Sequence, residues 1–147
     1  MEITQTIAMT LASNHGEISA AIACLAEQVK FCNLAAPDRQ PFNLFHVRLA
    51  LDEAMLNAVE HGSGRMANAK ILVVARLSAH LLEFNIEDPG PGFATVDLRI
   101  DDGKNLENLM LRGATKGKGW GLAIIRSLTH GLFWNARGNR ITMLFMR

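Results

Sequence analysis

Three polar side chains recur at every fourth residue of the segment LDEAMLNAVEHG, residues 51–62: Glu53, Asn57 and His61. On an α-helix this spacing places a carboxylate, an amide and an imidazole on one face, one turn apart. Such groups can accept a proton, hold a hard cation and contact a phosphate. Other sectors of the helix could pack on a core through Leu51, Met55, Leu56 and Val59. The pattern therefore indicates one wall of an active site, although solvated helix faces can show the same spacing.

A second segment with binding chemistry is DPGPGF, residues 88–93, at the end of an apolar run. Gly90 and Gly92 would allow a sharp turn and the close approach of a planar ligand. The carboxylate of Asp88 could accept a hydrogen bond from an exocyclic amine such as that of adenine. By itself, a turn rich in proline and glycine is an ordinary loop signature.

A third segment, GKGWGL at residues 117–122, opens a helical pattern. Glycines at a helix start leave backbone N–H groups free to bind an anion, and Lys116 and Lys118 add positive charge there. The spacing matches neither a P-loop nor a dinucleotide fingerprint. The remaining residues of this segment that could contact a phosphate are Gly117, Gly119, Gly121 and Leu122.

The elements that must position these segments follow from hydrophobic periodicity. Grouped strands with unevenly spaced helices predict an α+β two-layer sandwich, with helices on one face of a mixed sheet. The polar stretch 94–116 is long for a connection in a small domain and is typical of a lid. The predicted strands are 3–11, 69–77, 81–88, 132–136 and 140–145, with a hairpin at 78–80 and a turn at 137–139, and the predicted helices are 13–33, 42–61 and 120–129.

Composition limits the function classes. The chain has 147 residues, the size of one domain, and its formal net charge of +1 is dispersed, which gives no basic patch for nucleic acid. We find no apolar run long enough to span a membrane and no positive charge at the N-terminus typical of a signal peptide, so we expect a cytoplasmic protein. Cys24 and Cys32 are too far apart on one helix to form a disulfide.

The three motifs in this order resemble the ATP-binding domain of the GHKL superfamily, which includes gyrase, Hsp90, histidine kinases and MutL. There the segments correspond to an N box at about 51–62, a G1 box at 88–93, a lid at about 94–116 and a G2 box at 117–122, within a single domain of residues 1–147. EAMLNAVEHG, EDPGPGF and GKGWGLAIIRSL are similar to the small anti-sigma factor serine kinases of bacterial partner switching.

This resemblance implies a role for each motif residue. Asn57 would hold Mg²⁺, Asp88 would bind adenine, and Glu53 would be the general base that activates a serine or threonine hydroxyl. His61 and a lid lysine, Lys116 or Lys118, would lie near the phosphates. The glycines expected to contact the nucleotide are Gly90, Gly92, Gly117, Gly119 and Gly121, together with Leu122.

The resemblance also implies partners: a STAS-domain anti-anti-sigma protein as the substrate, a sigma factor or an equivalent regulator, and a second copy of the chain in a homodimer. Three alternatives have different consequences. A histidine-kinase catalytic module would need a helical phosphoacceptor segment, for which the region before residue 42 is too short. A catalytically silent adaptor would not need all three motifs, and a gyrase-like or MutL-like clamp would need a second domain.

Overall fold

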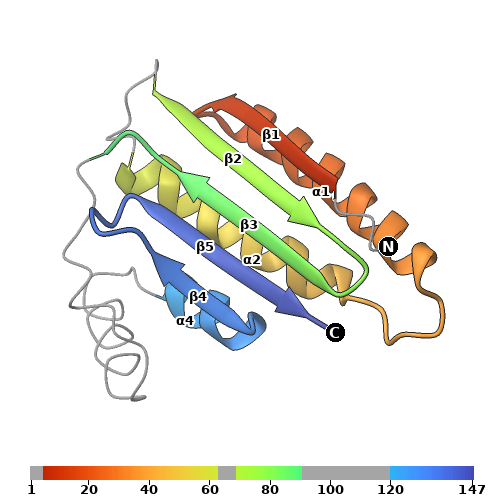
Figure 1. The fold of residues 1–147 in the computed structure, drawn as a ribbon. Coiled ribbons are helices and arrows are strands. Elements are labelled where there is room, and N and C mark those ends of the chain that lie inside the picture. Colours follow the sequence, from red (N-terminus) through yellow and green to blue (C-terminus); the bar gives the residue numbers. More distant parts are fainter. Residues whose placement is uncertain (1–4, 63–68, 91–119) are drawn as a thin grey trace.

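The computed structural model describes residues 5–62, 69–90 and 120–147. In these residues a five-stranded sheet is covered on one face by helices, while the other face is open (Figure 1). The α+β class and the layer of helices on a single face confirm the predicted fold class. The elements in chain order are β1 Gln5–Ala12, α1 His15–Ala35, α2 Leu44–Asn57, η1 Ala58–Gly62, β2 Lys70–Leu77, β3 Leu81–Glu87, α4 Trp120–Leu128, β4 Gly131–Trp134 and β5 Arg140–Met146.

The sheet has the strand order β1-β2-β3-β5-β4, and every pairing among the described strands is antiparallel. The prediction of a mixed sheet is therefore wrong for these strands. The strand β4, which follows α4, does run in the same direction as β3, as it would after a crossover connection. However, β4 and β5 form a hairpin, and β5 lies between β3 and β4, so no two parallel strands become neighbours.

The helix α1 begins where its sequence provides a cap. The side chain of Asn14 accepts a hydrogen bond from the backbone N–H of Glu17 at 2.9 Å, which satisfies one of the free donors of the first turn. One row of α1 is buried in the core: Ile18, Ala21, Ile22, Leu25, Ala26 and Val29. By length and composition alone α1 could cross a membrane, contrary to the sequence prediction, although core helices pass the same test.

The helix α2 is shorter than predicted. It begins after Asn43, whose side chain accepts from the backbone N–H of His46 at 3.1 Å, and its α-helical part ends at Asn57. The next turn, η1, is a π-helix. The N–H of Ala58 is shared between the carbonyls of Ala54 and Met55, where the winding changes. A π-turn in the predicted N box is notable because such turns occur frequently at functional sites.

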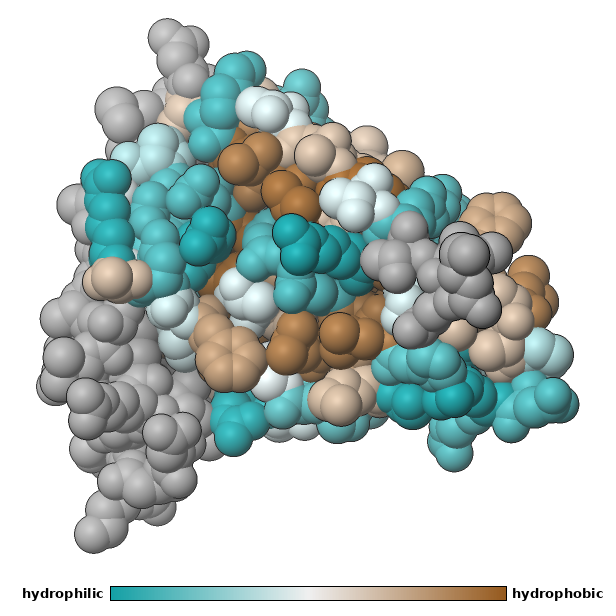
Figure 2. All heavy atoms as spheres, viewed as in Figure 1, coloured by the Kyte–Doolittle hydropathy of each residue, from teal (hydrophilic) through white to brown (hydrophobic). Residues whose placement is uncertain are grey.

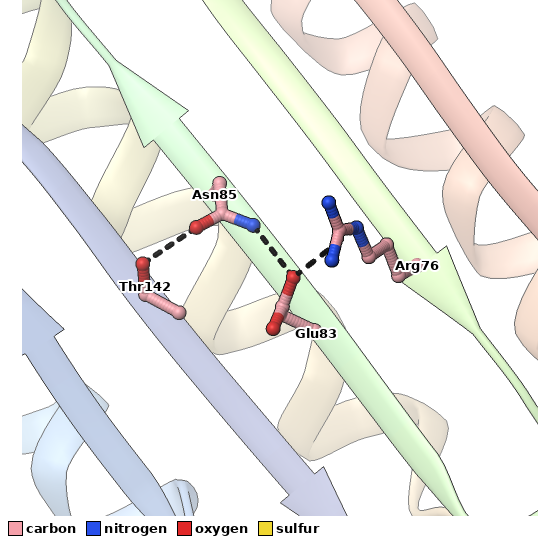
Figure 3. Close-up of polar contacts among 4 residues, drawn as sticks. All are labelled: Arg76, Glu83, Asn85 and Thr142. Atoms are coloured by element: carbon pink, nitrogen blue, oxygen red, sulfur yellow. Dashed lines mark hydrogen bonds and ion pairs between the residues drawn. The ribbon is translucent and has the colours of Figure 1, made fainter.

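The open face of the sheet carries a polar row in its middle. Thr142 donates to Asn85 at 2.6 Å, Asn85 donates to Glu83 at 3.0 Å, and Arg76 lies 3.7 Å from Glu83 (Figure 3). Hydrophobic side chains flank these hydrophilic ones on this face (Figure 2). These contacts pair the polar groups of neighbouring strands across the open face.

The last described residue, Arg147, ties several segments together at the end of β5. Its guanidinium donates to the carbonyls of Ala79 at 2.6 Å and Cys32 at 2.9 Å. It also donates to the Asn33 side chain at 3.0 Å and lies 4.5 Å from the centre of the Phe42 ring. These contacts join the β2–β3 turn, the end of α1 and the segment before α2. Cys24 and Cys32 are both free, as predicted.

Candidate active site

A cavity of about 120 Å³ opens at the end of the sheet where β3 finishes. Its walls come from six elements, α2, η1, β3, α4, β4 and β5, together with the residue after β3 and the β4–β5 turn, so it is a product of the tertiary fold. The sequence prediction assigned three of its residues to three different motifs: Asn57 in the N box, Asp88 in the G1 box and Leu122 in the G2 box. The other residues of the cavity wall are Ala54, Ala58, Ile86, Trp134, Gly138, Asn139 and Ile141.

The end of α2 and the first residue of η1 supply both polar groups and free space to this site. Ala54 and Ala58 are 3% and 5% exposed and lie one turn apart, facing the cavity. A larger side chain at either position would fill the space that their methyl groups leave. Asn57 also lines the cavity, and Glu53 lies one turn before it on the same helix. Neither alanine was predicted as a site residue, because alanine has no chemistry that a motif could reveal.

The first turn of α4 approaches Glu53 very closely. A Cβ atom on Gly121 would lie only 2.7 Å from Oε2 of Glu53 and 3.6 Å from the side-chain amide atoms of Asn57. Only glycine allows α4 to pack this near to the carboxylate without displacing it. The structure thus brings Gly121 beside the two residues that were predicted as base and metal ligand.

Burial raises the pKa of the Glu53 carboxyl above its usual value, and the nearby carboxylates of Asp52 and Glu60 raise it further. A raised pKa makes an ionised carboxylate a stronger proton acceptor. Glu53 is only partly buried, so it can still be reached from solvent. The electrostatic surroundings are those expected of a general base.

Asp88 follows directly after β3 and is held in a defined orientation. Its Oδ1 accepts a hydrogen bond from the buried backbone N–H of Gly90 at 2.8 Å, which forms an Asx-type turn. The pKa of this carboxyl is raised above its usual value, chiefly by burial. The Gly90 N–H and Arg137 act to lower it, and Glu87 acts to raise it. Among the described residues, Gly90 supplies the one hydrogen bond to the carboxylate, which leaves acceptor capacity for a ligand.

The turn between β4 and β5 forms the remaining wall, which the sequence prediction missed. Gly138 has a φ of 78°, in the left-handed region that favours glycine, and its N–H donates to Oδ1 of Asn135 at 2.9 Å. Asn139, 8% exposed, contacts the backbone of Asp88, and Trp134 provides an aromatic surface to the cavity. The turn at 137–139 was predicted, but nothing in its spacing indicated that it faces a site.

Several predicted site residues lie outside the described part of the chain. Gly92, Lys116, Gly117, Lys118 and Gly119 belong to the segments 91–119. The backbone of His61 is in η1, but its side chain is not among those described. The roles predicted for these residues, and for the lid as a whole, stay predictions.

The described residues fit a nucleotide and a hard metal ion in their donor chemistry. No group of three or more histidine, cysteine or acidic side chains that could hold a metal occurs in the described residues. A metal here would instead be held by the Asn57 amide oxygen together with phosphate and water oxygens, which is how Mg²⁺ is usually held with nucleotides. The alanine-floored space beside Asp88 and Trp134 suits a flat base.

The described residues form an α+β domain with a cavity between the sheet and the helices. A family model for the histidine kinase-like ATPase domain matches residues 8–145, nearly the whole chain. The protein therefore belongs to the histidine kinase-like ATPase family of the GHKL superfamily, as predicted. Domains of this family bind ATP, usually with Mg²⁺. A search of curated proteins found no match.

Proposed function

We propose that the protein is a serine/threonine kinase of the partner-switching type, which uses ATP and Mg²⁺ to phosphorylate a STAS-domain anti-anti-sigma protein. The observation that carries this proposal is the convergence of Asn57, Asp88 and Leu122 on one cavity, with Glu53 beside Asn57. A domain that only supported a fold would have no physical need for a partly buried carboxylate with a raised pKa next to a metal-binding amide.

Each residue has a distinct task in this proposal. Asp88 accepts a hydrogen bond from the exocyclic amine of the base, and Asn57 binds the metal through its side-chain oxygen. Mg²⁺, when bound, neutralises part of the charge on the phosphates. Glu53 accepts the proton of the serine hydroxyl while that oxygen bonds to the γ-phosphorus and the bond to the leaving ADP oxygen breaks. Gly121 lets α4 pack beside this carboxylate without displacing it.

The phosphorylated antagonist carries added negative charge at its interface, which weakens its hold on the kinase. The kinase is then free to sequester a sigma factor or an equivalent regulator. A homodimer is also part of the proposal. Support comes from β1, an edge strand without a charged residue in Gln5–Ala12, and from the exposed side chains of Phe31 and Leu34 on α1. Dispersed charge supports action in the cytoplasm, away from nucleic acid and membranes.

The test is transfer of labelled γ-phosphate from ATP·Mg²⁺ to STAS-domain proteins of the same organism. We expect an acid-stable phosphoserine on one of them. Glu53→Gln removes the proton acceptor but keeps the shape, so transfer should fall about 100-fold or more while ATP binding persists. Glu27→Gln, which neutralises an exposed carboxylate on α1 paired with Lys30, is the control and should transfer normally.

Three outcomes separate this proposal from its rivals. Rapid acid-labile autophosphorylation with ATP alone would point to histidine-kinase chemistry. ATP-dependent binding of a STAS-domain or sigma partner without any transfer would favour a catalytically silent adaptor. Normal transfer by Glu53→Gln would show that the assigned base is wrong.

A further inference from the structure

Asn139 holds the peptide groups of Asp88 from the neighbouring strand end, across 51 positions of sequence. The backbone N–H of Asp88 donates to the carbonyl of Asn139 at 3.0 Å. In return, the side-chain Nδ2 of Asn139 donates to the backbone carbonyl of Asp88 at 2.9 Å. One residue thus fixes the peptide groups on both sides of the Asp88 Cα, which sets the direction in which its side chain points.

Asn139 is itself held rigidly. Its side-chain oxygen accepts a hydrogen bond from Nδ2 of Asn135 at 2.7 Å, and its backbone N–H donates to Oδ1 of Asn135 at 3.0 Å. That same oxygen of Asn135 also accepts from Gly138 at 2.9 Å and Arg140 at 3.1 Å. Asn139 is only 8% exposed, and its two bonds with Asn135 are partly buried, so they can strengthen one another.

We propose that Asn139 is a positioning residue for base recognition: it holds Asp88 so that the carboxylate meets the exocyclic amine of adenine in the cavity that both residues line. This inference rests on the proposed function, because it assumes that the cavity takes an adenine nucleotide. The physical reason is that a directional hydrogen bond loses strength steeply when its acceptor is misplaced. The Gly90 N–H orients the carboxylate itself, whereas Asn139 orients the backbone that carries it.

The experiment compares two ligands that differ at one group. ATP and purine riboside triphosphate, which has hydrogen in place of the 6-amino group, are titrated by calorimetry with Mg²⁺. Since the amine contact should be a charge-assisted bond, we expect the wild-type protein to prefer ATP by about tenfold or more. Asn139→Asp keeps the side-chain size and the bond from Asn135 but cannot donate to Asp88, and it should lose about threefold or more of that preference.

The preference, rather than either affinity, is the decisive readout, because general damage to the fold would weaken both ligands equally. Asn139→Ala gives a second variant without the added charge. The control is Asn33→Ala, because Asn33 also bonds to the backbone carbonyl and N–H of one distant residue, Phe42, at 3.1 and 2.8 Å, but does so with both side-chain atoms and outside the cavity lining. It should lower stability and leave the preference intact.

An unchanged preference in both Asn139 variants, or an equal loss in Asn33→Ala, would overturn the positioning role while leaving ATP binding established. A wild-type protein that binds neither nucleotide would overturn the proposed function and this role with it. A wild-type protein that binds the two nucleotides equally would show that Asp88 does not contact the amine, which removes the role assigned to Asn139.

Discussion

Gly121→Ala should separate the stability of the domain from its catalysis. Alanine favours the helix by up to about 1 kcal/mol over glycine. The new Cβ would lie 2.7 Å from Oε2 of Glu53, too close for two atoms that are not bonded. The atom that must move is the end of a flexible side chain, and a strained or changed rotamer costs about 0.5–1.5 kcal/mol. The two effects nearly cancel, so the free energy of unfolding should change by less than about 1 kcal/mol.

The effect on function should be much larger, because the displaced group is the proposed base. We expect phosphotransfer to fall about tenfold or more, since a misplaced proton acceptor loses most of its contribution. The contact of the new Cβ with Asn57, at 3.6 Å, is an ordinary van der Waals distance. ATP affinity should therefore change by less than about threefold. The displaced carboxylate should also gain solvent, which would bring the pKa of Glu53 back toward its usual value in a carbon-13 titration.

Gly16→Ala is the matched control for this variant. Gly16 is the second residue of α1, as Gly121 is of α4, and its added Cβ would meet Oδ1 of Asn14 at 3.5 Å without crowding. It should show the gain in helix stability alone and full phosphotransfer. Chemical denaturation and a phosphotransfer time course on both variants measure the two effects. Full phosphotransfer by Gly121→Ala, or an unfolding free energy lowered by more than about 3 kcal/mol, would refute this account of the close approach.

Two further variants test the electrostatics and the packing at opposite ends of the sheet. Because burial raises the pKa of Asp88 in the folded state, its contribution to stability is complete at acid pH and is lost as pH rises through that pKa. The variant Asp88→Asn can still accept the hydrogen bond from Gly90. Urea unfolding should therefore show the variant to be more stable than the wild type at pH 8, and the difference in unfolding free energy should close below about pH 4. A difference that widened in acid would contradict the assigned effect of burial. The variant Arg147→Lys cannot reproduce the forked contacts with the carbonyls of Ala79 and Cys32. Its unfolding free energy should drop by about 1–3 kcal/mol, while its ATP affinity stays unchanged. An altered ATP affinity would contradict this and show that the two ends of the sheet are coupled.

Local signals in the sequence were enough to predict most elements of the fold. The polar residues at 13–14 indicated where α1 starts, and the structure identifies Asn14 as the cap; the β2–β3 hairpin follows from two apolar runs separated by a short polar turn. The π-turn after Asn57 could not be foreseen, because a shift of the hydrogen bonds by one residue leaves no periodic mark. The strand order also could not be foreseen, since a crossover and an inserted hairpin produce the same order of elements along the chain.

In the site too, residues within local motifs could be predicted from the sequence, whereas residues brought in by tertiary packing could not. Asn57, Asp88 and Gly121 belong to motifs whose residue types suggest their chemistry, and the structure places all three around one end of α2. Asn139 and Trp134 were missed because their importance depends on which residues the sheet brings next to them. Asn139 contacts Asp88 only because β5 pairs with β3, and that pairing is a property of the whole sheet.

Asp88 in the cavity wall and Glu53 beside Asn57 both carry a carboxylate that burial destabilises in its ionised form, and ligand binding could relieve this effect. Burial raises the pKa of both Glu53 and Asp88, so at neutral pH each ionised group is less stable in the folded protein than in water. A donor that bonds to Asp88, or a cation held by Asn57 near Glu53, would restore part of the lost solvation. Nucleotide binding should therefore stabilise the domain more strongly at pH 8 than at pH 5, because only the ionised carboxylates gain from it. The burial that lowers the free energy of unfolding of the domain without nucleotide would thus contribute to its affinity for the nucleotide, as is common where polar groups are preorganised for a ligand.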